Sequence, residues 1–179
     1  MTERIKEFEF TLKFSMPDTF ADPESFADQL RKAGCDDAII GIGQKGRIAL
    51  QFNREASRAL EAITSAIKDV KSVIPDARLI ESTPDLVGLT DIAQMLGFSR
   101  QNMRNLVLTH IQTFPAPVHS GTTSIWHLCN VLEWFEIKQH RAIEATIKEV
   151  ALANMEINLV KEYANLEPAS QAKLAALTL

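Results

Sequence analysis

The chain has 179 residues, which is room for one large domain or two small ones. Apolar residues make up 46% of it, and seven glycines and seven prolines are too few for a collagen-like chain or a long flexible linker. Nineteen basic and 23 acidic residues give a formal net charge of −4. Nonspecific nucleic-acid binders are usually basic overall, so any nucleic-acid binding by this chain is expected to be local.

The sequence predicts neither a membrane span nor a secretory signal. No stretch approaches the ~20 consecutive apolar residues of a membrane helix, and residues 1–9 lack the apolar core of a signal peptide. We therefore expect a soluble cytoplasmic protein. Cys35 and Cys129 form no C-x-x-C pair, which argues against a disulfide framework or a zinc finger and favours small core residues.

The first half of the chain carries the alternation and capping signals of an α+β domain. The expected elements are, in chain order, a strand over 8–14, a helix that starts at Asp22 and Pro23 and stops at Gly34, strands over 38–42 and 48–52, a helix capped by Asn53 that runs to Pro75, and a strand over 78–80. This order is that of the ferredoxin-like βαββαβ sandwich. We therefore expect such a domain within residues 1–83.

A ferredoxin-like fold serves for sensing, for assembly or for RNA binding, so it does not define a function. RNA binding would need exposed aromatic side chains on the central strands. The candidate positions, Ile40, Leu50 and Phe52, do not form such a run. We expect a sensor or assembly domain that takes an unknown small ligand or protein.

Residues 41–46 read Gly-Ile-Gly-Gln-Lys-Gly, which matches the dinucleotide-binding motif G-x-G-x-x-G. In a dinucleotide site these glycines open a helix whose N-terminus receives the pyrophosphate. Here a strand pattern follows at 47–52. The glycines therefore predict a hairpin turn instead.

The chain changes character after Pro84 and Asp85, where we place a domain boundary. In order, Thr90 is expected to cap a helix over 91–96, Gly97 to end it, and Ser99 to cap a second helix over 100–107. Two short helices joined by a tight glycine turn form a helix-turn-helix. The second helix of that motif can enter the major groove of DNA.

The second of these helices has an apolar and a polar arc. At ~100° per residue, the apolar arc holds Met103, Leu106 and Val107, and the opposite arc holds Arg100, Gln101, Arg104 and Asn105, with Asn102 at its edge. Arginine can pair with guanine, and asparagine or glutamine with adenine. An ordinary solvated face is the alternative, although this helix contains no Asp or Glu.

Downstream, two extended pieces at 114–118 and 124–126 flank a turn-rich tip at 119–123. This pattern predicts a wing beside the second helix. A third helix follows, with its apolar face and Trp134 over 128–135.

Four patterns in this region carry a family resemblance. They are Thr90-x-x-x-Ala93-x-x-Leu96-Gly97-Phe98-Ser99-Arg100, the run Phe114-Pro115-Ala116-Pro117, the pair Ile125-Trp126, and Val131-x-x-Trp134. Together they resemble the small winged helix-turn-helix domains of excisionases, AlpA-like regulators and MerR-like activators. The resemblance covers about residues 86–136, within a predicted domain over 84–136.

In that family the second helix reads the major groove and the wing touches the DNA backbone or the minor groove. The resemblance therefore implies readout by Arg100, Gln101 and Arg104, and we add Ser99, Asn102 and Asn105 to the expected DNA-binding residues. Two features depart from the family: a longer connection at 108–111, and His127 where Arg or Lys is common. Wing contacts would then fall to Ser120, Thr122 and Thr123 and to backbone N–H groups, which are weaker and less salt-dependent partners of phosphate.

The tail, residues 137–179, is expected to be a helical oligomerisation segment. From 130 to about 165 the chain lacks Gly and Pro, which predicts one long or kinked helix before Pro168, and residues 168–179 add a short helix or fray. The dimerisation positions are Ile143, Ile147, Val150 and Ile157 of a heptad pattern, with Asn154 at an a position, where a lone Asn fixes register. The alternative is an amphipathic helix packed back on its own domain.

No catalytic or metal site is predicted. His110, His119, His127 and Cys129 lack a matching ligand pair, and no H-E-x-x-H occurs. The adjacent Asp36 and Asp37 fall at a helix-to-strand turn, where Asp is favoured for its hydrogen bonds to the backbone. The flanking sequence supports no Ser/His/Asp arrangement and no phosphate-binding loop. We therefore expect that the protein is not an enzyme and binds no cofactor.

The sequence thus predicts a sequence-specific DNA-binding protein. It would be a dimeric transcriptional regulator or a mobile-element factor that binds double-stranded DNA. The alternative is a protein-interaction adaptor whose helix-turn-helix contacts another protein, which the acidic net charge favours.

Overall fold

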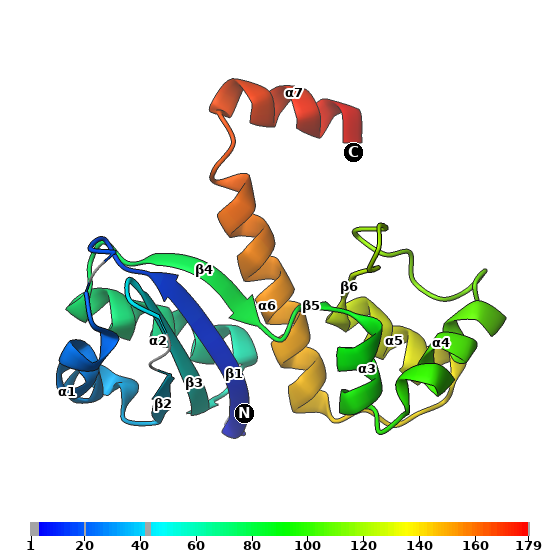
Figure 1. The fold of residues 1–179 in the computed structure, drawn as a ribbon, viewed down its shortest axis with the longest axis horizontal. Helices are drawn as coiled ribbons and strands as arrows, with labels where there is room; N and C mark the ends of the chain where they lie inside the picture. The colour runs from blue at the N-terminus through cyan, green and yellow to red at the C-terminus, as the bar shows by residue number, and fades with distance from the viewer. Residues whose placement is uncertain (1–3, 20, 42–43, 179) are drawn as a thin grey trace.

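The computed structural model describes residues 4–19, 21–41 and 44–178, and the chain is α+β. Figure 1 shows two lobes with helix α6 between them. We call the described residues up to Thr83 the sheet lobe and residues 84–138 the helical lobe. Within the described residues, no helix has both the length and the apolar character needed to span a membrane.

A four-stranded antiparallel sheet forms the sheet lobe. Its strands are β1 (Lys6–Ser15), β2 (Ala38–Gly41), β3 (Arg47–Ala56) and β4 (Arg78–Thr83), in the spatial order β2-β3-β1-β4. The two central strands pair over their full length, with Phe10 opposite Phe52 and Leu12 opposite Leu50. The predicted strand positions are confirmed, although Ile42 of the second predicted strand lies outside the described residues.

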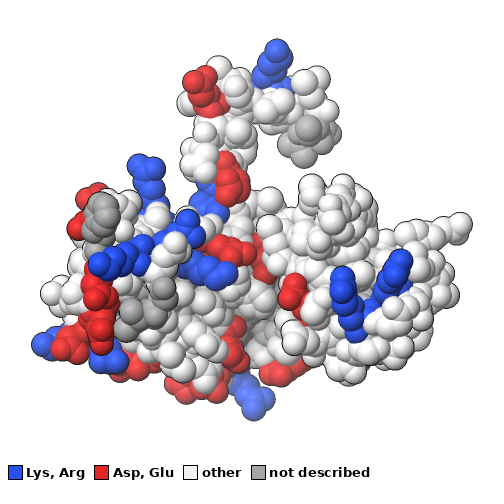
Figure 2. Space-filling model, in the orientation of Figure 1, with Lys and Arg blue, Asp and Glu red and all other residues white. Residues whose placement is uncertain are grey.

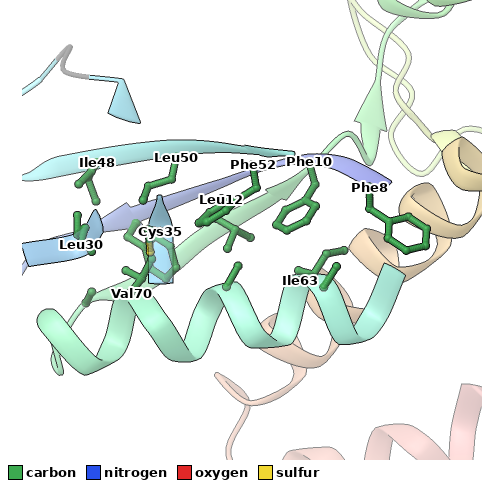
Figure 3. Packing of buried hydrophobic residues seen from close by; sticks show 14 of the residues in the cluster. Phe8, Phe10, Leu12, Leu30, Cys35, Ile48, Leu50, Phe52, Ile63 and Val70 are labelled. Atoms are coloured by element: carbon green, nitrogen blue, oxygen red, sulfur yellow. The ribbon is translucent and has the colours of Figure 1, made fainter. Parts of the chain in front are cut away.

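One face of this sheet is covered by helices. They are α2 (Ala59–Val73) and a continuous helical segment made of a 3-10 turn (Pro23–Phe26), α1 (Ala27–Leu30) and a π-helical turn (Arg31–Cys35). Figure 3 shows the alternate residues of β1 and β3 pointing from the sheet toward α2. Leu50 and Phe52 are fully buried there, so they offer no exposed platform for RNA bases.

Arg54 explains why the predicted cap at Asn53 is wrong. The strand alternation continues through Asn53 to Ala56, and α2 begins only at Ala59. Arg54 is 8% exposed, and its guanidinium binds Asp37 at 2.7 Å and 3.0 Å, Asp69 at 2.7 Å, and Ser65. A buried arginine with this many partners satisfies its donors without leaving the strand. Asp37 therefore binds a guanidinium, which its adjacency to Asp36 did not indicate.

The glycine-rich segment is a hairpin connection, as predicted. β2 and β3 pair in antiparallel fashion on either side of it, and β3 begins at Arg47 where a dinucleotide site would need a helix. Gly43 of the motif lies outside the described residues. Gly46 has φ of 72°, and an added Cβ there would lie 2.7 Å from Thr19 Cα.

The helical lobe has its own core. It contains β5 (Leu86–Val87), α3 (Leu89–Met95), α4 (Arg100–Thr109), β6 (Trp126–His127) and α5 (Leu128–Lys138). Ile92, Met103 and Leu132 are buried at its centre, and the rings of Phe114 and Trp134 meet edge-on at 4.9 Å. This cluster holds α3, α4 and α5 together.

The predicted long helix over 130–165 is two helices. α5 ends at Lys138 and α6 (Ala145–Tyr163) begins after a connection in which His140 has φ of 49°. Arg141 fixes this connection, because its guanidinium donates to Leu96 O at 2.7 Å and lies 5.1 Å from the Phe98 ring centre. A short helix, α7 (Pro168–Thr178), follows α6 and stands off the body of the molecule (Figure 1).

The predicted dimerisation face of the tail is occupied by the chain itself. Val150 and Asn154 are buried, Ile143 and Ile157 pack partly buried against the two cores, and only Ile147 is exposed, at 38%. This is the alternative arrangement of a helix packed on its own domain. Helix α6, the larger part of the predicted segment 137–179, therefore packs on both cores.

Asn154 binds the connection between the lobes and does not face a partner helix. It accepts from Ser82 Oγ and donates to Pro84 O, while Asn158 bonds both backbone groups of Ser82 and donates to the Asp85 carboxylate at 2.8 Å. The other Asp85 oxygen lies 2.6 Å from His127 Nδ1. Two asparagines one helical turn apart on α6 thus fix the predicted domain boundary in place.

Candidate nucleic-acid interface

Local capping sets the angle between α3 and α4. The predicted cap at Thr90 is wrong: helix α3 starts at Leu89, two residues before the predicted start at 91, and its N-cap is Gly88. The Asp91 carboxylate accepts from Gly88 N at 2.8 Å and so fixes this start. Gly97 has φ of 70°, a conformation that glycine adopts without strain, and it ends α3 as predicted. Ser99 then caps α4 by accepting from Asn102 N at 3.1 Å.

The two arcs of α4 lie as the sequence predicts. Met103 and Val107 are buried in the lobe core and Leu106 is half-buried. The exposed residues of α4 are Arg100, Gln101, Asn102, Arg104 and Asn105 on the predicted arc, and Leu108 and Thr109 in the last turn. Gln101 donates to Asn105 Oδ1 at 3.0 Å, so these two amides hold each other along the helix.

The segment after α4 forms a loop that faces this helix, which we call the 118–125 loop. It is closed by Val118 N donating to Ile125 O at 2.8 Å and by Ile125 N donating to His119 O at 3.0 Å. The following strand β6 pairs with β5, at Leu86 and Val87, and not with residues 114–118. The base of the loop is anchored by Trp126, whose indole N–H donates to Pro115 O at 2.9 Å.

A groove of about 670 Å³ separates α4 from the 118–125 loop. Its lining residues are Gly88, Leu89, Thr90, Asp91, Arg100, Gln101, Arg104, Thr122, Thr123, Ser124 and Ile125. Five of the predicted DNA-binding residues therefore meet in one groove. Ser99, Asn102, Asn105 and Ser120 do not line it. The start of α3, at Leu89 and Thr90, joins the lining although the sequence reasoning did not include it.

The missing signal for Thr90 was spatial. The start of α3 lies beside the exposed face of α4, so the exposed Thr90 lines the same groove as Arg100 and Arg104. The sequence also did not predict that Ser124 and Ile125 line the groove, because an extended pattern does not indicate which side of a loop faces a helix.

Charge is sparse around this groove. Residues 84–136 contain two basic side chains, Arg100 and Arg104, and four acidic ones. Figure 2 shows the basic side chains of the helical lobe among uncharged surface. Among the described residues neither arginine has a hydrogen-bond or ion-pair partner, so both guanidinium groups are free to bind an acceptor.

The histidines and cysteines serve local packing. The rings of His110 and Trp134 lie edge to face at 5.4 Å, His127 binds Asp85, and Cys129 Sγ lies 3.3 Å from Met155 Sδ. In the part of the chain that the structure describes, no three His, Cys, Asp or Glu residues are placed to hold a metal ion. Burial raises the pKa of the Cys35 thiol to about 11, with help from the Asp69 carboxylate, and burial also raises the pKa of Cys129.

Comparisons with protein-family models, with curated proteins and with solved structures found no match for this chain.

Proposed function

We propose that the chain is a cytoplasmic, sequence-specific DNA-binding protein whose helical lobe is a winged helix-turn-helix. The observation that carries this proposal is the groove in which two unpaired arginines and Gln101 of α4 face the hydroxyl groups of Thr122 and Thr123. The proposal treats α3 and α4 as the helix-turn-helix and the 118–125 loop as the wing. We further propose that the sheet lobe is ferredoxin-like, which the strand order β2-β3-β1-β4 supports.

In this proposal α4 lies in the major groove. Arg100 and Arg104 are one helical turn apart, so their guanidinium groups reach base edges on the same side of the helix. Each arginine can bind guanine O6 and N7 as a fork, and Gln101 can bind adenine N6 and N7. The bond between Gln101 and Asn105 restricts the glutamine amide before DNA arrives, which reduces the entropy lost on binding.

The 118–125 loop would contact the DNA backbone beside α4. Thr122 and Thr123 line the groove and supply neutral hydroxyl donors. Neutral donors to phosphate position a protein on the duplex without adding base recognition. The loop therefore contributes affinity for every sequence, and α4 contributes the preference for one.

The scarcity of charge sets the expected salt dependence. Because both arginines bind bases and the loop offers phosphate only neutral donors, log K should fall only shallowly as log salt rises. A single copy of such a lobe binds weakly. We therefore propose that two copies bind together, on half-sites one helical turn or a multiple of one turn apart, as a transcriptional regulator or a mobile-element factor.

The experiment is a titration of fluorescent duplex DNA at several salt concentrations. We expect Arg100→Ala and Arg104→Ala each to lower affinity for the recognised sequence by about 1 to 3 kcal/mol and to relax the preference for that sequence over other duplexes. The matched control is Lys138→Ala, because Lys138 is an exposed cation at the end of α5 and lies outside the groove. An unchanged preference in both arginine variants would contradict the proposal.

A protein-interaction adaptor is the second candidate. The observation that favours it is the charge of residues 84–136, where four acidic residues outnumber two basic ones. In that case the α4 groove would bind acidic side chains of a partner protein. The same titration separates the two candidates, since an adaptor shows no salt-dependent affinity for duplex DNA.

A further inference from the structure

Among the described residues no helix packs on the second face of the sheet, which we call the open face. Its outward residues are Glu7, Glu9, Thr11 and Lys13 of β1, Ile39 and Gly41 of β2, Arg47, Ala49, Gln51, Asn53 and Glu55 of β3, and Arg78, Glu81 and Thr83 of β4. They alternate with the buried core residues of the same strands. Figure 2 shows basic side chains across the upper middle of the sheet lobe and acidic side chains along its lower edge.

The strand register arranges these residues in rows. Glu7 lies opposite Glu55, Glu9 opposite Asn53, Thr11 opposite Gln51, Lys13 opposite Ala49, and Ser15 opposite Arg47. Successive rows are about 7 Å apart. The rows of Glu7 and Glu9 are therefore acidic, the row of Thr11 and Gln51 in the middle is neutral, and the last row, with Arg47, is basic. Between them, Lys13 is balanced by Glu81 of β4, which binds it at 2.8 Å.

The acidic end is unfavourable within one copy. Glu7 and Glu55 are like charges directly opposite each other, an arrangement that destabilises a sheet. Among the described residues neither carboxylate has a hydrogen-bond or ion-pair partner. Arg47, at the other end, likewise has no side-chain partner in the described part of the chain. Three exposed charges thus lack partners within the molecule.

We propose that the open face binds the open face of a second copy, about a two-fold axis that crosses the strands at the row of Thr11 and Gln51. This axis reverses the order of the rows. Glu55 then faces the partner's Arg47, and both of these charges lack a partner among the described residues of their own copy. Glu9 faces the partner's Lys13, which also binds Glu81 of its own copy. Because the interface is two-fold, every such pair occurs twice.

The charge pattern selects this arrangement over the other way to stack the two faces. A two-fold axis parallel to the strands would leave the rows in register and place acidic rows on acidic rows. The strand-reversed arrangement places the acidic row of Glu7 and Glu55 opposite the partner's basic row of Arg47. At its centre Ile39, 72% exposed, faces the partner's Ile39, and the small side chains of Ala49 and Gly41 allow the sheets to approach.

This interface deepens the proposed function, since it supplies the two-fold symmetry on which binding to paired half-sites rests. It forms without DNA, so it can fail or hold independently of the DNA-binding proposal. An interface made mainly of charge pairs is expected to be weak and to dissociate as salt rises.

Sedimentation equilibrium of the full chain, without DNA, tests this interface through a charge swap. We expect a monomer–dimer equilibrium at low salt that shifts to monomer at high salt. Arg47→Glu alone and Glu55→Arg alone should each weaken the dimer on the order of tenfold or more, because each puts like charges together twice. An equimolar mixture of the two variants should restore dimers, as should the double variant.

Two matched variants complete the experiment. Lys68→Glu, an exposed cation on the helix-covered side, should leave the equilibrium unchanged. Leu159→Ser removes an apolar side chain of α6 that is 51% exposed, and it too should have no effect. The proposal is overturned if the wild type stays monomeric at low salt or if the charge variants dimerise as the wild type does. It is also overturned if mixing the two charge variants restores no dimer, or if Leu159→Ser loses the dimer.

Discussion

The two lobes use charge in opposite ways. The first 83 residues hold 12 basic and 14 acidic side chains, whereas residues 84–136 hold two and four. In the sheet lobe the charges meet one another, as in the pair of Lys13 with Glu81 at 2.8 Å and in the cluster around Arg54. Within residues 84–136 the two basic groups, Arg100 and Arg104, have no side-chain partner among the described residues and line one groove.

This difference shows why net charge is a poor guide to the function of the chain. The acidic total arises from both lobes, and the surface that would meet DNA is set by two arginines on one helix. Attraction of cations to phosphate does not depend on the DNA sequence, whereas contacts to base edges do. A surface with few unpaired cations therefore favours recognition of bases over nonspecific attraction to the DNA backbone. The predictions below test how the two lobes differ.

The largest effect is expected where the sheet lobe buries its charge. Arg54→Met should destabilise the fold by about 3 to 5 kcal/mol, because it leaves the Asp37 and Asp69 carboxylates without their partner. Urea denaturation measures this loss. The matched control, Arg58→Met, replaces an exposed arginine nearby and should change stability by less than about 0.5 kcal/mol. A small effect of Arg54→Met would mean that the cluster adds little to stability.

Local sequence patterns predicted most helices and strands of both lobes. They failed where residues far apart in the sequence determine the end of a strand or the partner of a helix face. Asn53 has the chemistry of a helix cap, but the strand continues because Arg54 finds partners on α2 and at the start of β2. Likewise, the heptad pattern around Asn154 indicates a dimer seam, yet Ser82 and Pro84, from the middle of the chain, bind that asparagine. Periodicity shows which face of a helix is buried and not what buries it.

The groove was predictable only in part, because local patterns show which residues of a helix are exposed and not which other elements face them. Capping and arc positions placed Arg100, Gln101 and Arg104 correctly on the exposed side of α4. The residues that face them from α3, such as Thr90, depend on the angle between two helices, which no local pattern contains.

The second prediction concerns the polar contacts between the lobes. Asn158→Ala removes bonds to both backbone groups of Ser82 and to the buried Asp85 carboxylate. We expect a loss of about 1 to 3 kcal/mol, because these buried groups lose their partner. Thermal unfolding checks it, with Glu156→Ala on the exposed side of α6 as control. Equal stability of the two variants would mean that water replaces the lost bonds.

The third prediction separates the loop from α4. Replacing residues 119–123 with a shorter turn removes Thr122 and Thr123 from the groove, and it should weaken binding to all duplex sequences by a similar factor of about five. Ser120→Ala should have a smaller effect, since Ser120 does not line the groove. A loss confined to one DNA sequence would show that the loop reads bases.

The smallest effect compares the two thiols, one on each side of the boundary between the lobes. Both pKa values are raised by burial, so both thiols stay protonated near neutral pH and should react slowly with maleimide. Cys35 is fully buried and Cys129 is half-buried, so Cys129 should react first. Mass spectrometry of timed samples gives the order. Faster labelling of Cys35 would mean that the sheet lobe opens more readily than the helical lobe.

Selection of bound duplexes from a random-sequence DNA library tests the central claim most directly. The wild type should enrich a defined sequence with guanine at the positions that Arg100 and Arg104 reach. Arg104→Ala should lose the preference at one of these positions and keep the other, while Lys138→Ala should enrich the same sequence as the wild type. Recovery of no common sequence by the wild type, or of an unchanged sequence by both arginine variants, would contradict recognition of DNA by the α4 face.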